Sequence, residues 1–404
     1  MIVTIEKSTA FGEIAAPPSK SMAHRYLICG ALSEKSEIGN VDFSEDIKAT
    51  LGCLEGLGAK VEVNSGTVKI GGIGKSEKIN SNKLFCNESG STLRFLIPLC
   101  MLKGEEITLS GTKRLFQRPL NVYEEMCTSQ GIKFSQNDSS VTVNGVMKSG
   151  RYTVRGDISS QFISGLMMAL PNLSGESVID ITGKSESSSY LALTLKALAD
   201  FGVRISRIDE NTMYVKGGQT FKNRILEVEG DYSNAAFFDG FNLIGGNVAV
   251  TGLNPDSVQG DRVYKDIYPQ LLKGRCEIDI SDCPDLAPVL MALSAALKGA
   301  VLNGTHRLKI KESDRGYAMA EELAKFGCKV DVEEDRIEVF PCKLKTPILP
   351  LSAHNDHRIA MAVALLCTIT GGKIYGAEAV AKSLPDFFER IGKLGIKLKV
   401  ENAI

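Results

Sequence analysis

One arrangement of apolar and polar residues recurs along this chain. An apolar pattern of helical period ends at a Gly and is followed by strand-like alternation of apolar and polar residues. A Gly at that position is typical of a helix that ends in the left-handed conformation, and the alternation predicts a strand. The pattern occurs at Gly58, Gly131, Gly202, Gly274, Gly327 and Gly395, with spacings of 73, 71, 72, 53 and 68 residues. Four nearly equal spacings out of five indicate an internal repeat.

A second signal falls between these glycines. It is a Gly or Ser turn followed by a short run with strand character, and it begins at Ser36, Gly104, Gly175, Gly246, Gly299 and Gly372. Together the two signals predict a β-α-β-α-β-β unit that occurs six times, and therefore an α/β fold. Because repeats of this length exceed the units of solenoids, we expect two globular domains of three units each.

The boundary between the two domains is expected between the third and fourth units, near Gly230. The leading strand, within residues 1–12, has no unit of its own and is expected to complete the C-terminal half. We therefore predict one domain from residues 1–17 and 230–404 and another from residues 18–229, with the active site in the cleft between them. The chain would cross between the halves twice, near Pro17 and near Gly230.

Composition narrows the class of protein. The 404 residues are 43% hydrophobic, and 47 basic residues balance 48 acidic ones. A nucleic-acid partner usually requires a basic excess, so this balance argues against one. The N-terminal residues resemble a strand rather than a targeting segment, and the longest apolar runs are too short to span a bilayer. We expect a cytoplasmic protein with no membrane association.

The cysteines and histidines point to no metal centre. The ten cysteines contain no C-x-x-C pair, and we interpret them as reduced thiols. His354 and His357 are three residues apart, but no third ligand lies at a recognisable spacing. We therefore expect no metal site.

The most informative short segment is residues 16–25. Pro17 and Pro18 favour extended backbone, and Ser19, Lys20, Ser21 and Arg25 then coincide with the start of an apolar helical pattern. A helix N-terminus with added cations can hold an anion. An ordinary capped helix with solvated cations would have the same residues, so other segments must decide.

Several later segments place similar groups at helix starts. The first half has hydroxyls, amides and cations at residues 87–94, 113–119, 159–161 and 185–190. The second half has carboxylates and cations at residues 282–285, 309–315, 354–358 and 382. Taken alone, Asp285 could be a plain helix cap, and Glu312 with Arg315 an ordinary i,i+3 pair. If the halves face each other, they form a cationic cleft suited to two small polyanions, with carboxylates available for acid–base chemistry.

These segments, in this order, resemble those of the 5-enolpyruvylshikimate-3-phosphate (EPSP) synthase family over essentially the whole chain. The resemblance rests on Pro-x-Ser-Lys-Ser at residues 17–21, Gly90 to Arg94, Arg118-Pro119, Ser159-Ser160-Gln161, Lys-Glu-Ser-Asp-Arg at 311–315, Asn-Asp-His-Arg at 355–358, and Lys382. It implies the two-domain fold of enolpyruvyl transferases, an inside-out α/β barrel type with three β-α-β-α-β-β units in each domain.

The family's activity follows as an expectation. Its members transfer the enolpyruvyl group of phosphoenolpyruvate to the 5-hydroxyl of shikimate 3-phosphate and release phosphate, through a tetrahedral ketal. The step belongs to the shikimate pathway of aromatic amino-acid biosynthesis, and the resemblance implies that it needs neither a metal nor an organic cofactor. The expected partners are therefore these two small substrates, and we expect a monomer.

The resemblance also implies residue roles. Asp285 would accept the proton of the 5-hydroxyl, Glu312 would handle the proton at the methylene carbon, and Lys20 would assist. Phosphoenolpyruvate would be bound by Lys20, Gly90, Arg118, Gln161, Arg315, Arg358 and Lys382. Shikimate 3-phosphate would be bound by Lys20, Ser21, Arg25, Ser159, Ser160, Gln161, Ser187, Tyr190, Asp285 and Lys311.

Some positions depart from the family pattern. Glu88 and Ser91 stand where many members have Asn and Thr, and Arg307 stands where some have Asn. A carboxylate at position 88 weakens phosphoenolpyruvate binding unless a cation such as Arg94 pairs with it.

Two alternatives remain at this point. UDP-N-acetylglucosamine enolpyruvyl transferase has the same fold and chemistry, but usually carries a reactive Cys in the loop that corresponds to residues 113–119, where this chain has none. An RNA-end cyclase or a nucleic-acid clamp, built from related repeats, would need a basic excess or a nucleotide-binding loop. Neither occurs here, because the Gly-Lys-Ser triplets at 74–76 and 183–185 lack the leading Gly of a P-loop.

Overall fold

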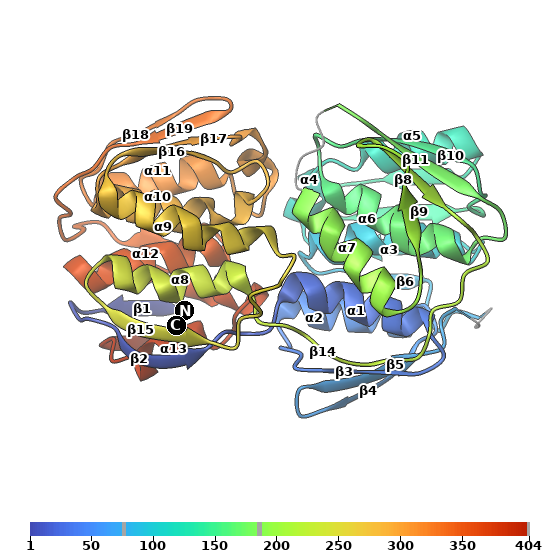
Figure 1. Ribbon diagram of the computed structural model, residues 1–404, viewed down its shortest axis with the longest axis horizontal. Helices are drawn as coiled ribbons and strands as arrows, with labels where there is room; N and C mark the ends of the chain where they lie inside the picture. The colour runs from blue at the N-terminus through green and yellow to red at the C-terminus, as the bar shows by residue number, and fades with distance from the viewer. Residues whose placement is uncertain (75–77, 184–187, 402–404) are drawn as a thin grey trace. The chain divides into compact units, whose positions relative to one another are not determined.

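The computed structural model describes residues 1–74, 78–183 and 188–401 and confirms the predicted α/β class. The chain divides into two compact units. Unit 1 contains Met1–Pro17 and Gly230–Ile404, and unit 2 contains Pro18–Glu229. Figure 1 traces the elements of each unit along the chain.

Unit 2 contains three four-stranded sheets with the same topology. In each, the first two strands of the order are parallel and the rest pair antiparallel. The orders are β14(Ile225–Glu227)-β3(Ser36–Gly39)-β5(Thr67–Gly71)-β4(Lys60–Asn64), β6(Lys83–Phe85)-β7(Ile107–Ser110)-β9(Ser140–Asn144)-β8(Lys133–Gln136), and β10(Arg151–Arg155)-β11(Ser177–Thr182)-β13(Thr212–Val215)-β12(Ile205–Arg207).

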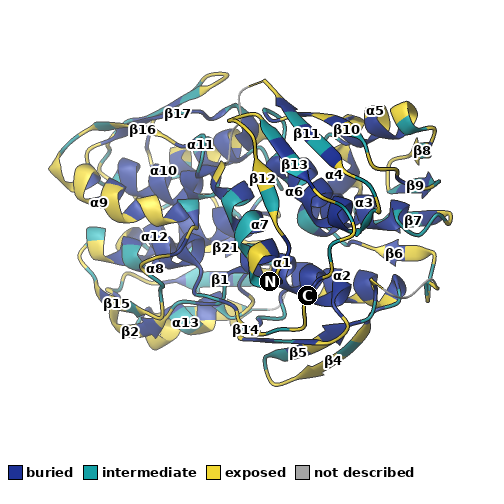
Figure 2. Cartoon of the chain, turned by 45° about the vertical axis from the view of Figure 1, so that its right-hand side comes forward, coloured by how far each residue is buried: buried dark blue, intermediate teal, exposed yellow. Residues whose placement is uncertain are grey.

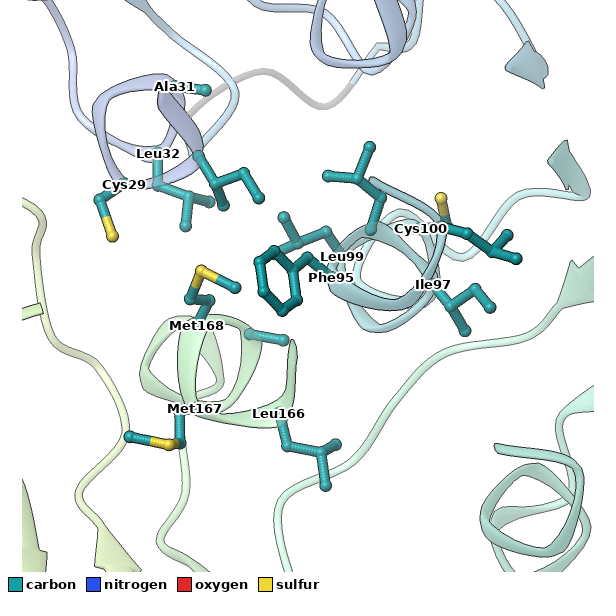
Figure 3. Packing of buried hydrophobic residues seen from close by; sticks show 14 of the residues in the cluster. Cys29, Ala31, Leu32, Phe95, Ile97, Leu99, Cys100, Leu166, Met167 and Met168 are labelled. Atoms are coloured by element: carbon teal, nitrogen blue, oxygen red, sulfur yellow. The ribbon is translucent and has the colours of Figure 1, made fainter. Parts of the chain in front are cut away.

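The core of unit 2 forms around three helices that are buried on nearly every side. These are α1 (Lys20–Leu32), α3 (Gly90–Met101) and α6 (Ser160–Ala169). Figure 2 shows them almost entirely buried, and Figure 3 shows Leu32, Phe95 and Met168 packed between them. Three further helices, α2 (Glu45–Gly56), α5 (Asn121–Gln130) and α7 (Ser188–Asp200), keep an exposed face, and α4 (Lys113–Gln117) is one short turn.

The three buried helices begin alike. Each has a Ser N-cap whose hydroxyl accepts a backbone N–H of the first turn, at Ser19, Ser89 and Ser159. Their positions in the sequence follow the predicted repeat. A capped N-terminus leaves the other N–H groups of the first turn available to an anion.

Unit 1 repeats this plan with one change. Its buried helices are α8 (Tyr232–Leu243), α10 (Ala287–Ala296) and α12 (His357–Thr370), and its amphipathic helices are α9 (Tyr264–Lys273), α11 (Arg315–Lys325) and α13 (Phe387–Lys393). The sheets are β16(Cys276–Asp279)-β17(Ala300–Asn303)-β19(Arg336–Val339)-β18(Val330–Val332), β20(Leu351–Ser352)-β21(Gly372–Tyr375)-β1(Ile2–Ile5)-β22(Leu398–Glu401), and the pair β15(Asn247–Thr251)-β2(Phe11–Ala15).

The fourth repeat explains the one short spacing. Five of the six marker glycines have positive φ, from +69° at Gly131 to +103° at Gly58. Gly274 has φ 175°, so its predicted left-handed helix end is wrong. The strand that follows it, β16, pairs in parallel with β17 and opens the next repeat. In the described part of the chain, the stretch between Gly230 and Gly274 therefore contributes one strand, β15, which pairs with β2 of the N-terminal segment.

The prediction that all ten cysteines are reduced is also wrong. Cys328 and Cys342 form a disulfide, with their Cα atoms 5.4 Å apart. They flank the hairpin of β18 and β19, and Phe340 N–H donates to the Lys329 carbonyl at 3.1 Å. The hairpin thus brings together two cysteines that are fourteen residues apart in sequence. No helix among the described residues is long and apolar enough to span a bilayer.

Candidate active site

The predicted site residues of unit 2 gather at the beginnings of the buried helices. We call Lys20, Ser21, Arg25, Gly90, Arg94, Arg118, Ser159, Ser160, Gln161 and Tyr190 the unit 2 cluster. Lys20, the first residue of α1, donates from Nζ to Asp46 Oδ2 of α2 at 2.7 Å. Its ammonium is therefore paired but remains partly exposed.

Arg25 lies one turn further along α1 and is almost completely buried. Its guanidinium donates to Thr194 Oγ1 at 2.8 Å and to the carbonyl oxygens of Ser21 and Tyr190 at 2.7 and 3.0 Å. It also lies 5.1 Å from the centre of the Phe95 ring. Because these partners are neutral, burial lowers the pKa of Arg25 to about 10. An anion placed here would recover the solvation that this guanidinium has lost.

Gln161 joins the beginnings of α6 and α3. Its backbone N–H donates to the hydroxyl of the N-cap Ser159, and its side-chain Nε2 donates to Ser91 Oγ at 3.0 Å. Its side-chain Oε1 accepts a hydrogen bond from Nη1 of Arg94 at 3.0 Å. Arg94 is not among the site residues predicted from the sequence, where it appears only as the end of the Gly90 to Arg94 motif and as a possible partner of Glu88.

Gly90 and Arg118 depend on each other sterically. The Arg118 guanidinium lies directly over Gly90, the first residue of α3, so that a Cβ at residue 90 would be 2.5 Å from Nη1. A larger residue would displace the guanidinium. The pair brings a cation next to the N-terminus of a helix, an arrangement that attracts anions.

In unit 1 the predicted residues form a dense group of charges around Asp285. We call Asp285, Lys311, Glu312, Arg315, Asp356 and Arg358 the unit 1 cluster. Asp285 Oδ1 accepts Arg315 Nη1 at 2.8 Å and Lys311 Nζ at 3.2 Å, and Oδ2 accepts Arg358 Nη2 at 3.0 Å. The side chain does not cap α10, whose N-cap is Leu286, so the plain-cap interpretation fails.

These contacts fix the protonation state of Asp285. Burial by itself would raise the pKa of this carboxyl, but Arg358, Lys311 and Arg315 together hold it well below its ordinary value. Burial lowers the pKa of Lys311 despite its carboxylate neighbours. In this structure Asp285 is therefore a fully ionised carboxylate with both oxygens occupied.

Arg315 is the most completely bonded cation of the site. It is 1% exposed and contacts three carboxylates. Nε donates to Asp356 Oδ2 at 2.8 Å, and Nη2 donates to Glu312 Oε2 at 2.7 Å, besides the bond to Asp285. The i,i+3 pair of Glu312 and Arg315 therefore exists, within a larger cluster. Although burial lowers the pKa of Arg315, these carboxylates raise it well above its ordinary value.

Asp356 organises the start of α12. This fully buried N-cap accepts the Arg358 N–H at 2.9 Å as well as the Arg315 guanidinium. Arg358 in turn donates to the Ser233 hydroxyl and to the Asp285 carbonyl. Lys382 joins the group through its hydrogen bond to the Asn355 carbonyl. Asp356 was absent from the predicted set; its position before an apolar helix is the signal that could have identified it.

A second carboxyl near Asp285 was also missed. Asp261 is buried in the short 3₁₀ turn Gly260–Val263, beside Ser233 and Arg358. Burial, together with the negative charges of Asp285 and Asp231, raises its pKa to about 7. No sequence pattern singled out this residue, because the neighbours that perturb it come from distant elements.

Two residues named in the sequence analysis, Ser187 and Arg307, are not part of either cluster as defined above. Ser187 lies outside the described residues. Arg307, which departs from the family pattern, donates to the Ser281 carbonyl.

One group of potential metal ligands occurs among the described residues. Atoms of Glu321, Glu322 and His354 lie within 4.8 Å of one another. Lys325 Nζ is 2.8 Å from Glu322 Oε1, so a cation already balances that carboxylate.

Comparison with known proteins gives a consistent result. Residues 6–391 match the family EPSP synthase (3-phosphoshikimate 1-carboxyvinyltransferase). Similar proteins include the 3-phosphoshikimate 1-carboxyvinyltransferases of Clostridium kluyveri, 42% identical, and Clostridium novyi, 40% identical; each match covers 97% of both chains. An EPSP synthase structure from Acinetobacter baumannii superposes with a TM-score of 0.79 at 23% identity, covering 99% of this chain and all of the other.

Proposed function

The chain belongs to the EPSP synthase (3-phosphoshikimate 1-carboxyvinyltransferase) family, and on that basis we propose that it transfers the enolpyruvyl group of phosphoenolpyruvate to the 5-hydroxyl of shikimate 3-phosphate. The observation that carries this proposal is the unit 1 cluster. Asp285, Lys311, Glu312, Arg315 and Arg358, which the family resemblance assigns to catalysis and binding, contact one another through hydrogen bonds of 2.7–3.2 Å.

In this proposal, phosphoenolpyruvate is bound mainly by cations. Lys20, Arg118 and Lys382 hold its phosphate, with Gly90 leaving room for close approach and Gln161 nearby. Arg315 and Arg358 hold its carboxylate, because a planar guanidinium matches a carboxylate in a two-bond arrangement. Both clusters then act on the same pair of substrates.

Shikimate 3-phosphate is assigned to the neutral and hydroxyl-rich groups of unit 2 together with Arg25. The lowered pKa of Arg25 supports this assignment, since a phosphate would stabilise its charged form. The cap and first turn of α6 contain Ser159, Ser160 and Gln161. The Tyr190 carbonyl accepts a hydrogen bond from Arg25, and Lys20 and Ser21 lie in the turn of α1 that precedes Arg25. Ser187, Lys311 and Asp285 complete the proposed set.

The reaction requires Asp285 to change its basicity. Its pKa is held too low for efficient proton removal while Arg315, Arg358 and Lys311 bind it. The carboxylate of phosphoenolpyruvate would compete for Arg315 and Arg358 and weaken their hold on Asp285. Substrate binding would thus raise the pKa of Asp285 and produce a base able to take the 5-hydroxyl proton.

The chemical steps follow from this arrangement. The 5-oxygen bonds to the central carbon of phosphoenolpyruvate as Asp285 takes its proton. Glu312, a carboxylate paired with Arg315 in the free protein, takes up a proton when the substrate displaces that pair and delivers it to the methylene carbon. The resulting tetrahedral ketal then loses a proton from the methyl carbon to Glu312, and its bond to phosphate breaks as the departing phosphate takes up the proton that Asp285 removed. Lys20, Arg118 and Lys382 stabilise the departing phosphate, and exclusion of water strengthens that stabilisation.

The direct test is phosphate release from phosphoenolpyruvate in the presence of shikimate 3-phosphate. We expect wild type to be active and Asp285→Ala to lose roughly 10²- to 10⁴-fold in kcat. Asp266→Ala, on the exposed face of α9, is the matched control and should remain near wild type. An inactive wild type, or activity only with UDP-N-acetylglucosamine as acceptor, would reject the proposal, and full activity of Asp285→Ala would reject the assigned base.

A further inference from the structure

The turn that precedes α12 has an unusual backbone. His354 and Asn355 have φ values of 49° and 53°, so two consecutive residues other than Gly adopt the left-handed conformation. This conformation is unfavourable for residues with a Cβ and persists only where the surroundings enforce it. The contacts of this turn within unit 1 must therefore include a group that stabilises its left-handed conformation.

The group that holds it is Glu322 of α11, a fully buried carboxylate. Its Oε2 accepts the backbone N–H of Ser352 at 3.0 Å, just before the turn. Its Oε1 lies 2.7 Å from His354 Nε2, inside the turn. Glu322 thus contacts both the backbone that enters the turn and a left-handed residue within it.

The charge of Glu322 is also fixed. Burial by itself would raise its pKa, but the bonds from His354, Lys325 and the Ser352 N–H hold the pKa below its ordinary value. An ionised carboxylate can only accept hydrogen bonds, so Nε2 of His354 carries a proton. The contact is a charge-assisted hydrogen bond, stronger than one between neutral groups.

The turn orients the cations proposed for phosphoenolpyruvate. The Asn355 carbonyl accepts the Lys382 ammonium. The next residue, Asp356, accepts Arg315 Nε at 2.8 Å and the Arg358 N–H at 2.9 Å. Asn355 and Asp356 therefore hold two cations directly, Lys382 and Arg315, and fix the first turn of the helix that carries the third, Arg358.

We propose that Glu322 and His354 are positioning residues for phosphoenolpyruvate, acting through the left-handed turn that orients Arg315, Arg358 and Lys382. The inference rests on the proposed function. It assigns a role in one substrate's binding to a pair, the buried Glu322 and the partly exposed His354, that would touch neither substrate. Of the residues proposed for shikimate 3-phosphate, Asp285 and Lys311 belong to the unit 1 cluster, but neither contacts the turn in a hydrogen bond described above. The hydrogen bonds of Arg25, in the same proposed site, are all made within unit 2.

The first experiment is steady-state kinetics of Glu322→Gln. We expect KM for phosphoenolpyruvate to rise roughly tenfold, because small displacements of binding groups are costly. KM for shikimate 3-phosphate and kcat should stay within about twofold of wild type. Glu321→Gln, an exposed neighbour on the same helix, is the matched control and should leave every constant unchanged.

A rescue variant separates positioning from general stability. In Glu322→Gln/Asn355→Gly, Gly adopts positive φ without support, so KM for phosphoenolpyruvate should return to within about threefold of wild type. If Glu322→Gln does not fold, His354→Asn provides the same test, since Asn tolerates the left-handed conformation but does not reach Glu322 as His does.

The outcomes are distinct. Equal rises in both KM values, a loss confined to kcat, or a double variant without recovery would reject the positioning role. Wild-type kinetics in Glu322→Gln would also reject it, with the proposed function intact. An inactive wild type would instead reject the proposed function itself.

Discussion

Two buried arginines, one in each unit, occupy opposite electrostatic environments. Arg25 in unit 2 donates to a hydroxyl and two carbonyl oxygens, and burial lowers its pKa to about 10. Arg315 in unit 1 contacts three carboxylates, which raise its pKa well above the ordinary value. The Arg25 guanidinium contacts no carboxylate among these partners, whereas the Arg315 guanidinium contacts three.

The helix beginnings show the same difference. The buried helices of unit 2 are capped by Ser19, Ser89 and Ser159, whereas α8 and α12 in unit 1 are capped by Asp231 and Asp356. A Ser cap leaves the positive end of the helix dipole available to a ligand, and an Asp cap neutralises it. Unit 2 is therefore prepared to receive an anion, whereas an anion in unit 1 must displace the protein's own carboxylates.

The largest expected effect tests the two arginines directly. Arg315→Met removes the main partner of the fully buried Asp356 and should lower the free energy of unfolding by about 3–5 kcal/mol. Arg25→Met relieves a buried charge whose partners are neutral and should change it by about 1 kcal/mol or less. Urea unfolding of both variants measures the difference. Equal losses would show that the two environments are not energetically distinct.

A second prediction uses the excess of carboxylates in unit 1. The pKa of Asp261 is about 7 in the folded protein and about 3.9 in an unfolded chain. Between these values the folded state binds more protons, so this residue makes stability fall as pH rises from about 4 to 7.

Asp261→Asn removes that dependence. Relative to wild type, the variant should gain about 2.6 kcal/mol in the free energy of unfolding between pH 5 and pH 8, because most of the pKa shift lies within that interval. Denaturation at both pH values measures the gain. A difference between variant and wild type that does not vary with pH would mean that Asp261 is ionised throughout.

The smallest effects concern the helix caps. Ser89 accepts the Thr92 N–H at 3.1 Å, and Ser89→Ala should cost about 1 kcal/mol at any salt concentration. Asp314, the cap of α11, accepts the Tyr317 N–H at 3.3 Å. Asp314→Ser retains a capping hydroxyl but loses the charge, so it should cost about 0.5 kcal/mol and almost nothing in about 1 M salt. Thermal unfolding at low and high salt distinguishes the two; a salt-dependent Ser89→Ala would contradict the contrast.

Local signals predicted most of the architecture because each repeat carries its own helix end. Gly58, Gly131 and Gly202 have positive φ for the reason their sequence pattern implied, namely a helix end that only Gly adopts easily. Gly274 had the same local pattern, yet the strand after it pairs with a later repeat. Strand partners are a long-range property, which a local pattern cannot contain.

The site residues could be proposed in the same way, but their electrostatic roles could not. The motif 311–315 contains Glu312 and Arg315 as neighbours on one helix, and that pair exists. The carboxylates that complete the environment of Arg315, Asp285 and Asp356, come from other elements. Glu322 and Cys328 were likewise missed because the residues that they contact are brought close only by folding.

The position of β1 has a consequence for how this protein is made. β1 is an inner strand that pairs with residues 372–375 and 398–401, and β2 pairs with residues 247–251. During synthesis, unit 2 is complete while the first seventeen residues still await partners that have not been translated. β1 is thus translated long before the two strands that flank it, and a variant without residues 398–401 would leave this inner strand with one open edge.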